Sequence, residues 1–307
     1  MPVEQYVEAI RERLPEYEVR QARSRAEEQR LVQDARIVTD RAIDEELLNL
    51  ADDLRLFACL SAGFDHLPLD SLAEQGVTVT NASGVHGPNI AEHVIGNILV
   101  FARRFHEGWR RQQRNEWRHY QAYELKDSTV TVVGLGAIGQ AIVERLNGFD
   151  VETIGVRYSP KKGGPTDQIV GFDESEFEPV LGATDYLVLA CPLTETTKGL
   201  IGELELTTLP AESVLVNVGR GGLVETDALV EALRNHEIRG AALDVTDPEP
   251  LPGEHPLWDL ENALITPHMA GHTPSYYERR ADILERNVRK IGERGAYSDL
   301  ENLVSPS

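Results

Sequence analysis

The chain has little lysine. Only five lysines occur among its 307 residues, and 51 acidic residues against 30 basic ones give a formal net charge of −21. A field this negative argues against nucleic acid and anionic membranes as partners. Abundant carboxylate with scarce lysine is typical of proteins from extreme halophiles, where salt screens the repulsion between acidic side chains. We therefore expect a halophilic protein, with an ordinary acidic cytosolic protein as the alternative.

Long apolar runs and cysteines are also scarce. No stretch approaches the roughly 20 apolar residues of a membrane span, and Met1–Gln5 lacks the basic and apolar regions of a signal peptide. Cys59 and Cys191 lie far apart in separate apolar runs, as expected of buried free thiols in a reducing cytoplasm. No Cys/His pattern has zinc-site spacing, so no metal is expected. No Gly-x-Ser-x-Gly occurs, which gives a serine hydrolase no support.

What is present is an alternation of strand and helix patterns across the second half of the chain. Six strands separated by helices predict a doubly wound parallel (Rossmann) sheet. We expect this dinucleotide-binding domain over residues 100–284, and a smaller, flavodoxin-like α/β substrate domain built from residues 1–99 and 285–307. The six expected strands are Thr129–Val133, Glu152–Val156, Tyr186–Ala190, Ser213–Asn217, Gly240–Asp244 and Ala263–Thr266.

The two ends of the chain have weaker patterns. Apolar spacing predicts a helix over Val3–Leu14, and Pro88 suits the first turn of a long helix that would run to about Arg111. A last helix is expected over Tyr276–Arg294, followed by a polar tail to Ser307. Short strands are expected at Glu18–Arg20, Arg36–Val38, Leu54–Leu60 and Val77–Thr80.

The first expected strand of the larger domain leads directly into Gly-x-Gly-x-x-Gly. Gly134 permits a tight turn, Gly136 lets a pyrophosphate approach the backbone, and Gly139 lets the following helix pack close to the strand. The motif alone is weak evidence, but a strand before it and a helix after it are the context that dinucleotide binding requires.

The end of the next strand carries a basic residue where an acidic one would indicate NAD. Arg157 stands there, followed by Tyr158 and Ser159. An arginine cannot accept a hydrogen bond from a ribose hydroxyl, whereas its fork suits a 2′-phosphate. We expect NADP to be preferred over NAD, with a solvated basic loop as the alternative.

Four chemically useful residues follow the last three strand ends. Arg220 can bind a carboxylate in two places, and His268 titrates in the range needed to donate a proton to a carbonyl oxygen. Glu249 can hold the imidazole in one tautomer and keep it protonated. Asp244 adds a carboxylate in the same region, with a helix N-cap as its alternative role. Together these residues predict reduction of a 2-keto acid.

In these motifs the chain resembles the D-isomer-specific 2-hydroxyacid dehydrogenases over nearly its whole length. The resemblance implies that Arg220 binds and polarises the substrate, that His268 is the acid/base with Glu249 as its partner, and that Asp244 faces the nicotinamide carboxamide. It also implies substrate contacts from the turn Ala62-Gly63-Phe64-Asp65. The other implied cofactor contacts are Ala137, Ile138, Cys191, Pro192, Val218, Gly219 and Gly271.

Several functions stay open at this stage. The leading one is an NADPH-linked D-2-hydroxyacid dehydrogenase, expected as a homodimer, that acts on a small 2-keto or 2-hydroxy acid. Glyoxylate or hydroxypyruvate reductase is the alternative within the enzymes. A dinucleotide-sensing binding protein without turnover is the alternative outside them, and the joint presence of Arg220, Glu249 and His268 argues against it.

Overall fold

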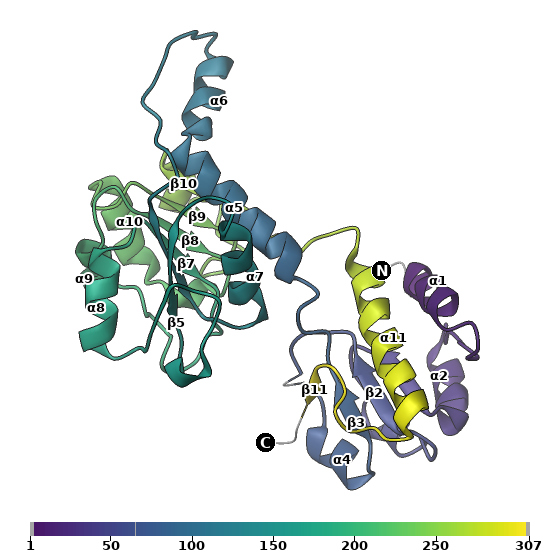
Figure 1. Ribbon diagram of the computed structural model, residues 1–307. Coiled ribbons are helices and arrows are strands. Elements are labelled where there is room, and N and C mark those ends of the chain that lie inside the picture. The colour runs from purple at the N-terminus through teal and green to yellow at the C-terminus, as the bar shows by residue number, and fades with distance from the viewer. Residues whose placement is uncertain (1–2, 65, 305–307) are drawn as a thin grey trace. The chain divides into compact units, whose positions relative to one another are not determined.

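The computed structural model describes residues 3–64 and 66–304. The chain divides into two compact units, each shown in Figure 1. The smaller unit combines both chain ends, Met1–Val85 and Thr273–Ser307, and the larger unit is His86–His272. The expected boundaries at 99/100 and 284/285 lie inside two helices, whereas the observed divisions precede those helices. A helix packs as a whole against its neighbours, so each of the two belongs entirely to one unit.

The larger unit contains a seven-stranded sheet in which all neighbouring strands are parallel, in the order β10-β9-β8-β7-β4-β5-β6. The six expected strands are all present, with ends shifted by at most one residue. The edge strand β6 was missed because it has only three residues, and pairing with β5 gives it its register. The strands are β4 (Thr129–Val133), β5 (Glu152–Val156), β6 (Gln168–Val170), β7 (Tyr186–Leu189), β8 (Val214–Asn217), β9 (Gly240–Leu243) and β10 (Ala263–Ile265).

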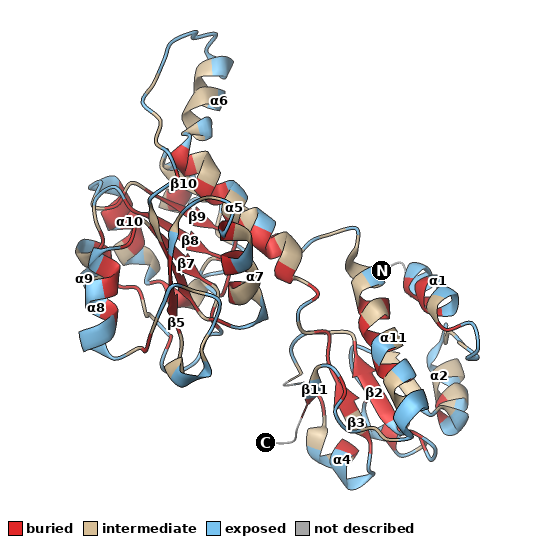
Figure 2. Cartoon of the chain, viewed as in Figure 1, coloured by how far each residue is buried: buried red, intermediate tan, exposed pale blue. Residues whose placement is uncertain are grey.

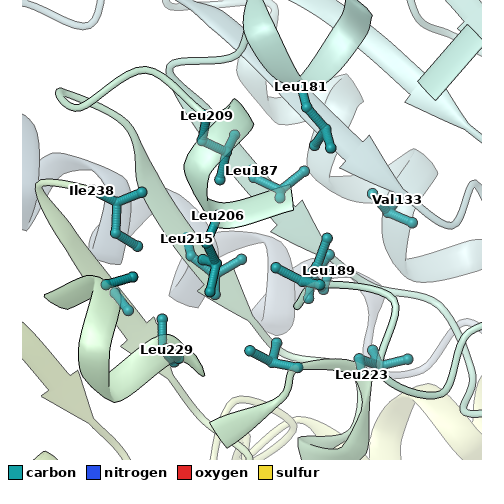
Figure 3. Packing of buried hydrophobic residues seen from close by; sticks show 14 of the residues in the cluster. Val133, Leu181, Leu187, Leu189, Leu206, Leu209, Leu215, Leu223, Leu229 and Ile238 are labelled. Carbon is teal, nitrogen blue, oxygen red and sulfur yellow. The ribbon is translucent and has the colours of Figure 1, made fainter. Parts of the chain in front are cut away.

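Helices cover both faces of this sheet, as the doubly wound prediction requires. Because side chains alternate along a strand, Tyr186 and Val188 of β7 join one core cluster with α5 (Gly87–Ala102) and α7 (Ala137–Leu146). Leu187 and Leu189 point into the opposite cluster, part of which is drawn in Figure 3. That second cluster includes α8 (Glu174–Gly182), α9 (Glu203–Thr208) and α10 (Thr226–Arg234). The inner strands β7, β8 and β9 are buried along their whole length (Figure 2), whereas the edge strands β6 and β10 are only partly buried.

The long helix expected to run to Arg111 is two helices, which corrects the prediction. Arg104 adopts a left-handed conformation with φ 51°, and this ends α5 and begins α6 (Phe105–Gln113). The Ala102 carbonyl, which a continuous helix would use internally, instead accepts a hydrogen bond of 2.8 Å from the returning chain at Tyr123. Helix α6 and its return segment therefore form an arm that projects from the larger unit (Figure 1).

The smaller unit contains a mixed sheet in the order β1-β2-β3-β11. Its first three strands are parallel, and β11 (Leu303–Val304) pairs antiparallel with β3 inside the stretch expected to be a polar tail. The remaining elements are α1 (Val3–Arg13), α2 (Arg25–Leu31), β1 (Ile37–Asp40), α3 (Glu45–Leu48), β2 (Leu56–Cys59), α4 (Leu69–Glu74), β3 (Thr78–Thr80) and α11 (Tyr276–Arg294).

The strand expected at Glu18–Arg20 is absent, which is a second correction. The Val19 carbonyl accepts hydrogen bonds from the Arg11 guanidinium, at 2.8 Å from Nη2, instead of pairing with a neighbouring strand. A side chain of α1 thus uses the acceptor that a sheet would need. Four short 3₁₀ helices complete the fold, at Val32–Asp34, Pro160–Lys162, Gly221–Leu223 and Pro256–Asp259. Within residues 3–64 and 66–304, no helix is long and apolar enough to cross a membrane.

Candidate active site

The glycine turn that follows β4 is shaped by backbone contacts that exclude side chains. Gly134 has φ 98°, and a Cβ there would lie 2.7 Å from the Cys191 backbone. A Cβ on Gly139 would lie 1.9 Å from the Gly134 carbonyl oxygen. The two glycines thus serve the roles that the sequence predicted for them, a left-handed turn and a close approach of α7.

The middle glycine faces open space. A Cβ on Gly136 would meet nothing within 4 Å, and Gly136 and Ala137 are both exposed. The first turn of α7 carries no acidic side chain, and no side chain caps its N-terminus. The first N–H groups of a helix have no partner within the helix and attract anions. A dinucleotide pyrophosphate therefore fits this turn, with the N–H groups of Ala137 and Ile138 available to it.

The end of β5 lies beside this turn, because the N–H of Gly134 donates to the Val156 carbonyl at 2.8 Å. Arg157 comes next, and its Nη1 donates to the carbonyl of Gly163, which holds the side chain across its own loop. Within the described residues the guanidinium makes no ion pair with a carboxylate. Tyr158 is 82% exposed and Ser159 is half-buried. This end of the sheet therefore presents an unpaired cation beside the phosphate-binding turn.

Cys191 follows β7 on the other side of the glycine turn. It is buried, and this burial raises the pKa of its thiol to about 11, so the sulfur stays protonated at neutral pH. Pro192 is exposed, and its carbonyl accepts a hydrogen bond of 2.7 Å from Thr197 Oγ1. The segment forms a wall of the turn with its backbone, and the thiol is not available as a nucleophile.

The loop after β8 carries Arg220. Asn217 supports it from both sides: its Oδ1 accepts from the Gly219 N–H at 3.0 Å, and its Nδ2 donates to the Arg220 carbonyl at 2.9 Å. Val218 is buried, and a Cβ on Gly219 would lie 2.8 Å from the Cys191 carbonyl oxygen. Arg220 itself is exposed and donates only to the adjacent Gly219 carbonyl, at 2.7 Å, among the partners that the described chain offers. Among the described residues, Arg220 forms no ion pair with a carboxylate.

The loops after β8 and β9 meet through a glycine. A Cβ on Gly221 would lie 2.0 Å from the Thr246 carbonyl oxygen, so only a glycine allows the two backbones to approach this closely. Thr226 Oγ1 adds a hydrogen bond of 2.9 Å to the Asp247 carbonyl. These contacts tie the loop that carries Arg220 to the one that carries Glu249.

Asp244 ends β9 and organises the loop after β10. It is 3% exposed. Its Oδ1 accepts from Thr266 Oγ1 at 2.6 Å and from the Met269 N–H at 2.9 Å, and its Oδ2 accepts from the Ala270 N–H at 2.9 Å. No helix begins at Asp244, so the N-cap alternative is wrong. Its carboxylate instead holds the backbone on the C-terminal side of His268.

His268 and Glu249 form a direct pair, with 2.6 Å between Nδ1 and Oε1. Both side chains are partly exposed, at 52% and 42%. His268 has φ 49°, a left-handed conformation that is uncommon outside glycine and that concentrates at functional sites. The Asp244 carbonyl accepts from its N–H at 2.8 Å and helps to hold that conformation. The predicted pairing of these two residues is present, with Nε2 left as the other proton-carrying atom of the ring.

One side of α5 supports the same loop, and sequence reasoning missed this. His86 Nδ1 lies 3.0 Å from the Gly271 carbonyl oxygen, Asn89 Nδ2 donates to the Ala270 carbonyl at 2.7 Å, and His93 Nε2 lies 3.2 Å from Thr266 Oγ1. Residues 86, 89 and 93 are three and four positions apart, which places them on one face of a helix. That spacing was the available signal, but only the packing shows which loop the face meets.

The predicted substrate loop belongs to the smaller unit. Ala62 and Gly63 are exposed. The Ala62 carbonyl accepts from Asn81 Nδ2 at 2.7 Å, and Phe64 packs against the core of the smaller unit. The N–H groups of these three residues have no acceptor among the residues that the structure describes. Asp65, the last residue of this expected turn, lies outside the described residues.

In the described ranges, no three His, Cys, Asp or Glu side chains gather as ligands of one metal ion would. The larger unit therefore has the features of a dinucleotide-dependent dehydrogenase: a phosphate-binding turn, an acid/base pair and an exposed arginine, all at strand carboxyl ends.

Comparisons with known proteins identify the family. The family model for the NAD-binding domain of D-isomer specific 2-hydroxyacid dehydrogenases matches residues 95–270. A glyoxylate reductase of Thermofilum pendens is 34% identical over 259 residues, which cover 82% of this chain and 76% of that protein. A glyoxylate reductase/hydroxypyruvate reductase of Mus musculus is 35% identical over 268 residues, 84% of this chain and 80% of that protein.

A solved structure agrees. The NADPH-dependent glyoxylate/hydroxypyruvate reductase of Sinorhizobium meliloti, in complex with citrate, has a TM-score of 0.72, with 27% identity over 97% of this chain and 94% of that one. The chain belongs to the D-isomer specific 2-hydroxyacid dehydrogenase family. It is an oxidoreductase that uses a nicotinamide dinucleotide to reduce 2-keto acids.

Proposed function

We propose that this enzyme reduces a small 2-keto acid of the glyoxylate or hydroxypyruvate kind to the corresponding 2-hydroxy acid, with NADPH preferred over NADH. The observation that carries the proposal is the His268–Glu249 pair, 2.6 Å apart and partly exposed, in a unit that also presents Arg220 without a carboxylate partner among the described residues. The names of the relatives in Thermofilum, mouse and Sinorhizobium support the substrate class.

The proton step follows from the geometry of the pair. Glu249 Oε1 engages Nδ1 of His268, so the proton for the substrate carbonyl oxygen is carried on Nε2. The carboxylate stabilises the imidazolium and fixes its tautomer, as a partner of a catalytic histidine does. The bound dinucleotide supplies the hydride. Arg220 stabilises the negative charge that develops on the carbonyl oxygen and binds the substrate carboxylate.

The other site residues are assigned roles by their placement. The N–H groups of Ala62, Gly63 and Phe64 are assigned to the substrate carboxylate, because they are not used within the described chain. Cofactor contacts are assigned to the glycine turn (Gly134, Gly136, Ala137, Ile138 and Gly139), to Cys191-Pro192 and Val218-Gly219, and to Asp244 and Gly271. Asp244 already accepts three hydrogen bonds, so any contact with the carboxamide would be an additional one.

The preference for NADPH rests on the end of β5. Arg157 has no acidic partner among the described residues and is oriented by the Gly163 carbonyl. Lys161 and Lys162 are exposed in the same loop, and neither forms a salt bridge with a carboxylate among the described residues. In a chain with 51 acidic residues, a loop with three unpaired cations suits a 2′-phosphate.

We propose a homodimer because the arm formed by α6 and its return segment exposes large aromatic side chains. Trp109 is 56% exposed and Trp117 is 101% exposed, and Phe105 adds a further exposed aromatic side chain at 47%. Exposed tryptophans with arginines are typical of interface anchors, and the arm is basic while the chain as a whole is strongly acidic. A second copy of the chain offers the complementary negative surface. Light scattering should give the mass of a dimer for wild type and a lower average mass for Trp117→Ala at the same concentration. A monomeric wild type would contradict the proposal.

The halophilic proposal rests on charge. A net charge of −21 implies repulsion that salt screens, and two buried free thiols, Cys59 and Cys191, suit a reducing cytoplasm. We expect the melting temperature to rise between low salt and molar KCl. A melting temperature that is flat or falling over the KCl series would reject the proposal.

One experiment tests the function as a whole. Purified enzyme is assayed with a panel of 2-keto acids that includes glyoxylate, hydroxypyruvate, pyruvate and a branched 2-keto acid, each with NADPH and with NADH. The expected result is the highest kcat/KM for a two- or three-carbon acid with NADPH. Dinucleotide binding without turnover on any acid would favour the sensing protein, and preference for a branched acid would reject the substrate assignment.

A further inference from the structure

Helix α11 of the smaller unit buries an arginine, two of whose nitrogen atoms have no hydrogen-bond acceptor among the described residues. Arg280 is 3% exposed, and its Nε and Nη1 atoms are buried without a partner in the described chain. The guanidinium carbon lies 3.4 Å from the centre of the Tyr276 ring, which accounts for one face of the group. Its buried N–H groups still need an acceptor, because a buried donor without one is strongly disfavoured.

A small cavity adjoins this side chain. Its volume is about 20 Å³, and it lies where β2, β3, α1 and α11 meet. The polar residues that line it are Tyr6, Cys59, Thr80, Asn81 and Arg280. A cavity of this size holds one species as small as a water molecule. A substrate with several heavy atoms does not fit.

The described residues that line the cavity include no Asp or Glu side chain. Burial raises the pKa of Tyr6 to about 12 and also raises the pKa of Cys59, so both stay neutral. Burial lowers the pKa of Arg280 to about 10, which leaves it charged. Arg41, a second cation, acts on Arg280 in the same direction. Asp40, a carboxylate outside the lining, acts on Cys59. Among the described residues that line the cavity, Arg280 is thus the charged one, in a chain whose net charge is −21.

We propose that the cavity is a binding site for a monatomic anion, chloride in a cellular setting, held by Arg280. An anion supplies the two things that the guanidinium lacks, a hydrogen-bond acceptor and an opposite charge. A water molecule supplies only the acceptor. The size of the cavity excludes carboxylates and phosphates. The lining residues all belong to the smaller unit, whereas the glycine turn and His268 belong to the larger unit.

The anion would also stabilise the loop that follows β2. Leu60 and Asn81 line the cavity, and Asn81 Nδ2 donates to the Ala62 carbonyl at 2.7 Å. An occupant in contact with Asn81 restricts the donor of that hydrogen bond, and contact with Leu60 restricts the chain two residues before its acceptor. We expect slower amide hydrogen exchange at residues 60–64 in chloride than in a large organic anion at the same potassium concentration.

The direct test uses bromide, which replaces chloride and scatters anomalously. Crystals of the full chain grown or soaked in KBr should show an anomalous peak within about 3.5 Å of an Arg280 nitrogen. This measurement needs no variant, so it decides the question even if substitutions at Arg280 impair folding. A cavity that holds a water molecule or nothing, with no anomalous signal, overturns the proposal.

A stability series adds a solution test with a matched control. The melting temperature is measured in KCl and in potassium gluconate at equal concentrations, for wild type, Arg280→Met and Arg289→Met. Arg289 is an exposed arginine on the same helix, paired with Glu285 at 2.9 Å. Wild type and Arg289→Met should gain about 2–4 °C in chloride, with saturation, and Arg280→Met should lose this gain. An equal chloride gain in all three proteins overturns the proposal.

Discussion

The two ends of the parallel sheet in the larger unit are built in opposite ways. After β4, glycines shape the loop. Gly134 gives a left-handed turn, Gly136 leaves an open surface, and Gly139 allows α7 to pack closely. After β8, β9 and β10, polar side chains shape the loops. Asn217 and Asp244 bind these loops through five hydrogen bonds in all. The glycine turn leaves space for a ligand, whereas the hydrogen bonds of Asn217 and Asp244 fix the loops that carry Arg220 and His268.

This difference determines which substitutions are harmful at each end. At the glycine end, an added methyl group collides with the backbone or occupies the ligand's space. At the side-chain end, the removal of one acceptor leaves buried N–H groups without a partner.

The largest effect is expected at His268. Asparagine tolerates the left-handed conformation that His268 adopts, so His268→Asn removes the acid without straining the loop. We expect turnover to fall by about a hundredfold to ten-thousandfold, with an unchanged melting temperature. The control is His272→Asn, an exposed histidine in the same segment. Turnover within threefold of wild type for His268→Asn would remove it from the mechanism.

Gly139 and Gly136 make a matched pair at the other end. Gly139→Ala places a Cβ 1.9 Å from the Gly134 carbonyl oxygen, so we expect a loss of about 1–3 kcal/mol in the free energy of unfolding and dinucleotide affinity reduced by about a hundredfold. Gly136→Ala meets no protein atom; its stability should stay within about 0.5 kcal/mol of wild type, while affinity falls about tenfold. Calorimetry with NADPH and thermal unfolding measure both. Equal behaviour of the two variants would refute the contrast.

Asp244→Asn tests the side-chain end without changing its shape. An amide has one acceptor oxygen instead of two, so at least one of the hydrogen bonds from Thr266, Met269 and Ala270 is lost. We expect a loss of about 1–3 kcal/mol in stability and turnover lowered by about tenfold. Asp247→Asn, in an exposed position of the adjacent loop, serves as the control. If the two variants have the same stability and turnover, Asp244 does not organise the loop.

A further substitution tests the choice of cofactor. A charge-assisted contact between Arg157 and a 2′-phosphate contributes about 1.5–3 kcal/mol, which corresponds to about one to two orders of magnitude in preference. Arg157→Asp should lower kcat/KM for NADPH and raise it for NADH, whereas Lys198→Asp should leave the ratio unchanged. Molar salt should reduce the preference if solvent reaches the contact. A wild-type enzyme that prefers NADH would end this proposal.

Local patterns in the sequence predicted the larger unit well. Each of its six expected strands combines several apolar residues with a turn that follows, and burial on both faces makes such strands continuous apolar runs. The edge strand β6 lacks that signal because one of its three residues is a glutamine and its neighbours are polar. In the smaller unit, the local sequence does not distinguish strand from coil at Glu18–Arg20 or around Leu303. Contacts decide it: the Val19 carbonyl binds the Arg11 side chain and forms no strand, whereas Leu303 pairs with the distant Thr80.

The amino-acid sequence by itself determined the residue types of the chemistry: three glycines in a turn, an arginine, a glutamate and a histidine after strand ends. Those follow from local conformation and from the rule that parallel strands end at one edge. Only the tertiary structure decided which atoms meet: Nδ1 of His268 with Glu249, the face of α5 with the loop after β10, and Arg280 with a cavity instead of a carboxylate. These contacts join residues distant in sequence, and their distances depend on how whole helices and strands pack.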